Sequence, residues 1–388
     1  MPVWLSYPSR PTRGRGSPPP PPPTAATKHC LVYFVPGNPG FIDYYEPFLS
    51  TLRARLDEVE DKKRAGSDGR DDLRFHLLGR NLLGFDDGDD GGGSYGPGPF
   101  DLDTQTRAVW DTVANARVDV GAQGGPRHGT AFDEVVLMGH SVGSYIALDV
   151  FRRQQAAHPE GRPRGHRNLQ KKHSPSESDK VVPVGGTGHL NLRLGVLLFA
   201  TLNHLALSKR GQKLERVLLT TPVVSAWADV LAQAVVWWLL PVWLLAAVVH
   251  YVLRFPPHAA ATTLRFLTSR RGVRQALFLG RDELQKIGPD EWEDELWEVA
   301  AAGGDAYGER GDNGKHARPK FVILFGEDDH WVDNGVRDEF IARRNAHAAS
   351  RAQIVLDERG WPHDFCIWHG EEVAETVTTW LDDLAESL

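Results

Sequence analysis

Short apolar runs alternate with amphipathic stretches along most of the chain. The runs are rich in β-branched, aromatic and aliphatic residues and are apolar on both faces, as strands buried in a parallel sheet are. They are CLVYFV (30–35), LRFHLLG (73–79), EVVLMG (134–139), LRLGVLLFA (192–200), KFVILFG (320–326) and AQIVLD (352–357). Helical patterns lie between or after them, over 102–117, 142–156, 335–348 and 370–386. This alternation predicts a doubly wound, mostly parallel sheet of the α/β class.

Polar segments interrupt this pattern. The first 28 residues are rich in proline and arginine, which predicts a disordered tail. Residues 57–72 and 86–99 are dominated by Asp, Gly and charged side chains, so we expect surface loops there. The segments 158–180 and 303–319 are polar and lack periodicity, and they are expected to be insertions outside the core.

Composition and charge exclude several classes of protein. The chain has 388 residues, a formal net charge of −7 and a pI of about 6.1, which argues against nucleic-acid binding. Its two cysteines, Cys30 and Cys366, indicate neither a disulfide framework nor a cysteine-rich zinc site. The start of the chain has no apolar stretch typical of a secretory signal peptide. We expect no cofactor and no metal.

Two serines lie in a G-x-S-x-G pattern, which in the right context marks a serine nucleophile. Ser94 lies in GGSYG, within a Gly/Asp-rich run that has no predicted strand before it and no helix after it. Ser141 lies in GHSVG, directly between the apolar run 134–139 and the helical pattern 142–156. A tight strand–turn–helix elbow would lift its hydroxyl clear of the sheet. The sequence therefore favours Ser141 as the nucleophile.

A serine nucleophile needs a histidine base and a carboxylate that orients it, in the chain order Ser, Asp or Glu, His for this topology. The run 320–326 is followed by EDDHWV, from which we select Asp329, with Asp328 as the alternative. The run 352–357 is followed by ERGWPHDFCIWHG. His363 lies in that loop and is our candidate base, whereas His369 falls where the last helix begins.

Backbone N–H groups are expected to bind the oxyanion that forms during attack. One is the N–H of Val142, the residue after the nucleophile. The other is expected in PGNPG, the loop after the first strand, where Pro36 and Pro39 have no N–H to donate. Asn38 is the candidate for this second donor, and Gly40 is the alternative.

An uncharged apolar run, VLAQAVVWWLLPVWLLAAVVHYVL, covers 230–253. Pro241 divides it into halves of roughly 17 Å as helix, too short to cross a hydrocarbon core of about 30 Å. Both flanks are basic, which places both ends on one side of a membrane. We therefore predict a monotopic hairpin or an embedded lid, with a buried pair of cap helices as the alternative. The expected organisation is a core of 29–200 and 320–388, with a helical, apolar cap or lid over 201–319.

Together, PGNPG followed by FIDYYEPF, GHSVGSY, FGEDDHWV and PHDFCI resemble the lipid droplet-associated hydrolase family of the α/β-hydrolase superfamily. The resemblance runs from residue 30 to 388, apart from the polar insertions. It implies an α/β-hydrolase fold with Ser141, Asp329 and His363 as the triad. It also implies a location on lipid droplets and the endoplasmic reticulum, and lipid esters such as sterol esters or triacylglycerol as substrates.

Three activities remain open from the sequence. The first is hydrolysis of a hydrophobic ester at a droplet or membrane surface contacted through 230–253, on the cytoplasmic face. The second is acyl transfer or thioester hydrolysis by the same residues. The third is a droplet-coating protein with little catalysis, in which the apolar run carries the function.

Overall fold

A seven-stranded sheet forms the centre of the described part of the molecule, in the order β1-β3-β2-β4-β5-β6-β7. The computed structural model describes residues 4–7, 27–66, 72–87, 93–119, 127–157, 190–219, 230, 232–234, 240–290, 292, 296–297, 321–346 and 352–388. The strands are β1 (Trp4–Tyr7), β2 (Lys28–Val35), β3 (Leu73–Arg80), β4 (Glu134–His140), β5 (Leu192–Leu198), β6 (Phe321–Gly326) and β7 (Ala352–Asp357). All neighbouring strands are parallel except β1 and β3, which confirms the predicted sheet.

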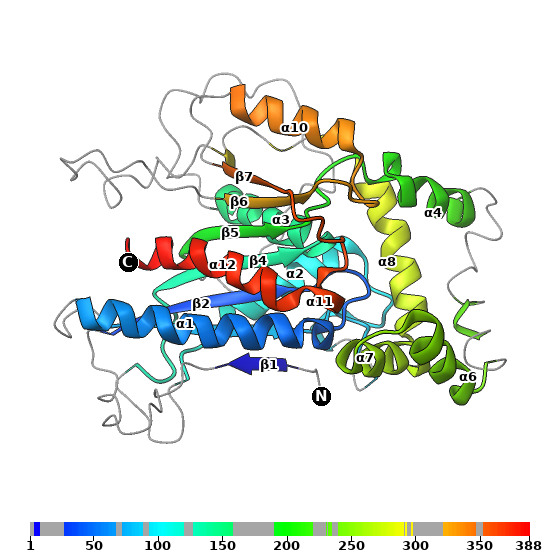
Figure 1. Ribbon diagram of the computed structural model, residues 1–388, viewed down its shortest axis with the longest axis horizontal. Coiled ribbons are helices and arrows are strands. Elements are labelled where there is room, and N and C mark those ends of the chain that lie inside the picture. Colours follow the sequence, from blue (N-terminus) through cyan, green and yellow to red (C-terminus); the bar gives the residue numbers. More distant parts are fainter. Residues whose placement is uncertain are drawn as a thin grey trace.

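Helices cover both faces of this sheet (Figure 1). On one face α1 (Glu46–Gly66) lies beside α12 (Gly370–Ala385), and on the other α2 (Leu102–Asn115) lies beside α3 (Val142–Ala157). The remaining core helices are α10 (Asn334–Ala346) and the short α11 (Phe365–Trp368). Every residue of β4 and β6 is buried, as expected for central strands with both faces covered.

The edge strand β1 corrects the prediction of a disordered tail over residues 1–28. Trp4–Tyr7 pairs antiparallel with β3, and Leu5 and Tyr7 pack against the core. The proline content of the tail concealed a short β-prone sequence, WLSY, that can extend an open sheet edge. Lys28 also belongs to the sheet, as the first residue of β2.

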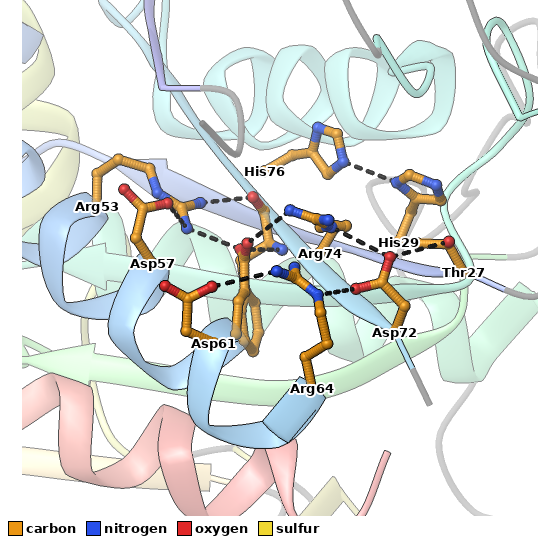
Figure 2. Close-up of polar contacts among 11 residues, drawn as sticks. Thr27, His29, Arg53, Asp57, Asp61, Arg64, Asp72, Arg74 and His76 are labelled. Carbon is orange, nitrogen blue, oxygen red and sulfur yellow. Dashed lines mark hydrogen bonds and ion pairs between the residues drawn. The ribbon is translucent and has the colours of Figure 1, made fainter. Parts of the chain in front are cut away.

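Helix α1 corrects the prediction of a loop over 57–72, because it continues to Gly66. A buried ion pair holds its second half, with Arg53 Nη2 2.7 Å from Glu60 Oε1. The same Glu60 oxygen accepts a hydrogen bond from the N–H of Phe75 on β3. The charged sequence is therefore an amphipathic helix whose polar residues are tied to the sheet, as the cluster in Figure 2 shows.

The segment between β5 and β6 forms a cap of helices beyond the carboxyl ends of the strands, at the right of Figure 1. The cap elements are the 3₁₀ turn η5 (Leu205–Leu207), α4 (Lys209–Leu219), α6 (Val242–Ala247), the π-helical turn η6 (Val248–Leu253), α7 (Pro257–Thr268) and α8 (Gly272–Lys286). Helix α7 is tied to the core because Tyr44 contacts Thr263 at 2.9 Å and His258 Nε2 donates to the carbonyl of Cys366 at 3.1 Å.

The apolar run is partly described. Pro241 is the N-cap of α6, so a helix begins in the middle of the run. Large apolar side chains are exposed over α6 and η6. We call them the apolar cap face: Val242, Trp243, Val248, Tyr251, Val252 and Leu253. Among the described residues, no helix is both long and apolar enough to cross a membrane. The insertions 158–180 and 303–319 lie outside the described residues.

Candidate active site

Ser141 occupies a sharp turn between β4 and α3. Its φ is 55°, in the left-handed region that non-glycine residues rarely adopt. The glycines around it are required by close packing, because a Cβ at Gly139 would lie 2.2 Å from the Gly143 oxygen. A Cβ at Gly143 would lie 2.2 Å from the Val35 oxygen. Ser94, by contrast, is exposed in the 3₁₀ turn η2 (Gly93–Tyr95).

The structure brings Ser141, His363 and Asp329 together in one hydrogen-bonded row. His363 Nε2 lies 2.9 Å from Ser141 Oγ, and His363 Nδ1 lies 2.6 Å from Asp329 Oδ2. Asp329 can only accept from Nδ1–H, which leaves Nε2 free to accept the serine proton. The carboxyl ends of the parallel strands β4 and β6 supply the serine and the aspartate, and the loop after β7 supplies the histidine.

The surroundings of the two candidate carboxylates differ. The side chain of Asp329 is 2% exposed, and its other oxygen, Oδ1, accepts the N–H of Trp331 at 2.8 Å. Burial raises the pKa of Asp329, but His363 and the Trp331 N–H outweigh it and hold the pKa below its usual value. Asp328 is exposed and pairs with Lys209 at 2.8 Å. Only Asp329 therefore reaches His363.

His369 lies away from this row. It precedes α12, and its Nδ1 is 3.5 Å from Glu372 one turn along the same helix. His363, and not His369, is therefore the histidine that lies beside Ser141.

The loop after β2 lies against Ser141, the candidate nucleophile. A Cβ at Gly37 would be 3.0 Å from Ser141 Cβ. Among the described residues, no protein acceptor takes the N–H of Asn38 or Val142. Gly40 packs instead against Leu82, whose N–H donates to its carbonyl. The oxyanion assignment of Asn38 and Val142 stays a prediction.

The side chain of Asn38 has a role that the sequence did not reveal. Its Nδ2 donates to the carbonyl of Ala276 at 2.9 Å and to Glu283 Oε1 at 3.0 Å, both on cap helix α8. Burial raises the pKa of Glu283 to about 8, against the lowering effect of the Asn38 hydrogen bond. In the sequence, Glu283 is one charged residue of an amphipathic helix, and no local pattern distinguishes it.

Two further residues were missed beside Ser141. His140 is buried and bonds both to Tyr45 and to the main chain of His363. Burial, and then the neighbouring His363, lower the pKa of His140 to about 3, so its ring is neutral. His140 lies in the motif GHSVG and Tyr45 in FIDYYEPF, but no spacing in the sequence connects the two residues.

A cavity of about 230 Å³ adjoins His363. Its walls come from the loops after β6 and β7 and from the cap: Arg210, Glu327, Asp328, Trp331, Trp361 and His363. Charged side chains and the rings of Trp331 and Trp361 share this lining, and most of its surface is apolar.

Comparison with known proteins places the chain in a family. The family model described as lipid-droplet associated hydrolase matches residues 28–366. No curated protein matches the sequence. The similar solved structures include the peroxisomal alpha-beta-hydrolase Lpx1 from Saccharomyces cerevisiae, with 9% identity, a TM-score of 0.49, and coverage of 99% of this chain and 89% of that one. A thermophilic esterase from Thermogutta terrifontis has 12% identity, a TM-score of 0.43, and coverage of 99% and 94%.

Similarities this distant do not indicate an activity. The sheet order, the elbow at Ser141 and the cap between β5 and β6 are those of an α/β-hydrolase fold. Because the family model covers most of the chain, the protein belongs to the lipid-droplet associated hydrolase family.

Proposed function

We propose that the protein is a serine esterase that cleaves neutral lipid esters, either sterol esters or acylglycerols, at the surface of lipid droplets. The observation that carries the proposal is the row formed by Ser141, His363 and Asp329, with contacts of 2.9 and 2.6 Å. A buried carboxylate, an oriented imidazole and a strained serine in this order are the requirements for acyl transfer through a serine ester.

The chemistry assigned to each residue follows from its contacts. Ser141 Oγ attacks the ester carbonyl while His363 Nε2 takes its proton. His363 then returns the proton to the departing alcohol, and Asp329 holds Nδ1–H and stabilises the imidazolium. The N–H groups of Asn38 and Val142 receive the oxyanion. Water activated by His363 then releases the acid from Ser141.

Hydrolysis, as opposed to acyl transfer to another alcohol, is favoured by the cavity beside His363. This cavity of about 230 Å³ has room for water, and the charged side chains of Arg210, Glu327 and Asp328 lie among the residues of its walls. The same residues would also attack a thioester, so they suit either an oxygen ester or a thioester as the acyl donor.

The apolar cap face supports contact with a lipid surface. Trp243 is 71% exposed and Tyr251 is 73% exposed, in a segment without charged residues. Large apolar side chains exposed together on one short segment are typical of an interaction surface, and aromatic rings suit the headgroup level of a phospholipid layer. We place the protein on droplets and on the cytoplasmic face of the endoplasmic reticulum, which are both bounded by such layers.

The test is hydrolysis of emulsified triacylglycerol and sterol ester by the purified protein beside Ser141→Ala. We expect release of fatty acid by the wild type and none by the variant. Equal release by both proteins would refute the assignment of Ser141. If neither protein releases fatty acid from these lipids or from a small ester, a coating role becomes the better account.

A further inference from the structure

A chain of three hydrogen bonds runs behind the triad through Tyr45 and His140. The N–H of Gly37 donates to Tyr45 Oη at 3.0 Å, and Tyr45 Oη lies 2.7 Å from His140 Nδ1. His140 Nε2 lies 2.8 Å from the carbonyl oxygen of His363. We refer to these contacts as the Tyr45–His140 chain. Tyr45 and His140 are 3% and 4% exposed, so water does not compete for the bonds.

The direction of every bond in this chain is fixed. A carbonyl only accepts, so His140 must carry its proton on Nε2 and donate it to His363. The ring is neutral because burial lowers its pKa to about 3, which leaves Nδ1 as an acceptor. Tyr45 must then donate its O–H to Nδ1, and its oxygen accepts the N–H of Gly37. One tautomer and one hydroxyl orientation satisfy all the partners.

The chain joins parts of the site that come from separate segments. Gly37 precedes Asn38 on the candidate oxyanion loop, and His140 precedes Ser141 on the elbow. The far end holds the main chain of His363 itself. Ring contacts accompany the bonds, with centroids 5.0 Å apart between His140 and His363. The polar chain thus spans the nucleophile, the base and the oxyanion loop.

We propose that Tyr45 and His140 are positioning residues, which hold the His363 loop and the oxyanion loop in register with Ser141. This inference rests on the proposed esterase function. It adds the two residues that keep His363 and the oxyanion loop aligned with Ser141. Neither residue touches the substrate in this account. Their loss is expected to lower kcat and to leave KM nearly unchanged, because a misplacement of about 1 Å can cost on the order of 100-fold in rate.

The test compares Tyr45→Phe with Tyr44→Phe, using p-nitrophenyl butyrate as a small soluble substrate. Both variants lose one buried tyrosine hydroxyl from the turn η1 (Ile42–Tyr45), but the Tyr44 hydroxyl bonds to Thr263 on the cap. Active sites are counted from the end point of fluorophosphonate labelling, so that unfolded protein does not enter kcat. We expect kcat per site to fall roughly 10- to 100-fold for Tyr45→Phe and less than about 2-fold for Tyr44→Phe.

A second pair of variants distinguishes the hydrogen bonds of His140 from the volume of its side chain. His140→Gln keeps a neutral donor and acceptor, whereas His140→Leu keeps neither. We expect Gln to retain kcat within about 5-fold and Leu to lose on the order of 100-fold, with KM within about 2-fold in both. Equal kcat per site in Tyr45→Phe and Tyr44→Phe, or equal losses in the two His140 variants, would overturn the inference. A rise in KM with kcat unchanged would also overturn the inference.

These outcomes are separate from failure of the proposed function. If the wild type hydrolyses the ester and Ser141→Ala does not, the function stands whatever the Tyr45 and His140 variants do. If the wild type shows no hydrolysis that depends on Ser141, the function fails, and the inference fails with it.

Discussion

Asp329 and Asp328 are adjacent in the sequence but have opposite surroundings. Asp329 is buried and bonds to His363, and Asp328 is exposed and bonds to Lys209. Loss of the carboxylate that fixes the histidine tautomer is very costly in serine hydrolases, whereas an exposed ion pair contributes little.

We therefore expect Asp329→Asn to lower kcat by roughly 10⁴-fold, and Asp328→Asn by less than about 10-fold. The measurement is kcat on a small soluble ester, with the melting temperature of each variant as a control for folding. Similar losses in the two variants, or the reverse order, would contradict the choice of Asp329.

His29 on β2 and His76 on β3 form a buried pair, with His29 Nδ1 2.9 Å from His76 Nε2 (Figure 2). Burial lowers the pKa of His76 from 6.5 to about 3, with further lowering by His29, Arg53 and Arg74. The unfolded chain therefore binds a proton between these pH values that the folded chain excludes. The stability that neutral His76 contributes is fully present above 6.5, the pKa of the group in the unfolded chain, and is lost as the pH falls below that value.

The expected result is that His76→Gln loses less stability than the wild type between about pH 7.5 and 5, by roughly 2 kcal/mol in the free energy of unfolding. Urea unfolding at both pH values measures it. The protonation account of His76 is wrong if both proteins lose the same amount.

The three residues of the candidate triad could be selected from the sequence because each follows a strand in the expected chain order. Ser141 follows β4, Asp329 follows β6 and His363 follows β7, and the structure brings their side chains together, while their catalytic roles stay a prediction. Tyr45, His140 and Glu283 could not be selected in this way. Their importance lies in partners distant in sequence, such as His363, which is 223 positions after His140.

At the scale of elements, the cap helix α8 is bound to the candidate oxyanion loop through Glu283 and Asn38. The pKa of Glu283 in the folded protein is about 8, against 4.5 as the ordinary value. The folded protein keeps a proton that the unfolded chain releases in this window. The free energy of unfolding contributed by this group therefore falls as the pH rises from 4.5 to 8.

Glu283→Gln keeps the acceptor for Asn38 but cannot ionise. We expect it to stabilise the protein relative to wild type by roughly 1–3 kcal/mol near pH 8.5, and by much less near pH 5. Chemical unfolding at the two pH values provides the measurement. A stability difference that does not change with pH would contradict a raised pKa at Glu283.

The apolar cap face on α6 and η6 is expected to bind lipid. Replacing Trp243 and Tyr251 by arginine should weaken binding to droplets on the order of 10-fold for each residue, which is about 1.4 kcal/mol, because each change removes an aromatic ring suited to the interface and puts a charge in its place. Leu356→Arg is the matched control, because Leu356 is an exposed apolar residue on β7, a strand that lies apart from α6 in Figure 1.

The measurement is flotation with artificial droplets, together with hydrolysis of a small ester. Loss of droplet binding with retained small-ester hydrolysis is the expected pair of results. Retained binding would place the lipid contact elsewhere. If Leu356→Arg weakens binding equally, a general effect of charge is responsible and not the cap face.

Elements were predictable from the sequence where burial on both sides made them uniformly apolar. The six parallel strands agree with their apolar runs to within a few residues. Composition misled at β1, because prolines dominate the segment around it. It misled again at α1, where charges that suggested a loop are paired on the helix or against the sheet.

In the molecule as a whole, the candidate triad lies between the sheet and the cap. The parallel strands bring their carboxyl ends to one edge, and the cap helices lie beyond that edge (Figure 1). This arrangement puts the apolar cap face and the triad at the same end of the protein. The fold class followed from strand and helix alternation, but the cap's contacts with the oxyanion loop required the tertiary structure.

Covalent labelling by a fluorophosphonate probe measures whether Ser141 is an activated nucleophile. The probe should attach to Ser141 in the wild type, as located by mass spectrometry of peptides. Labelling should disappear in Ser141→Ala and persist in Ser94→Ala, since Ser94 lies exposed in a turn without a histidine partner among the described residues. Labelling that survives in Ser141→Ala would contradict the account.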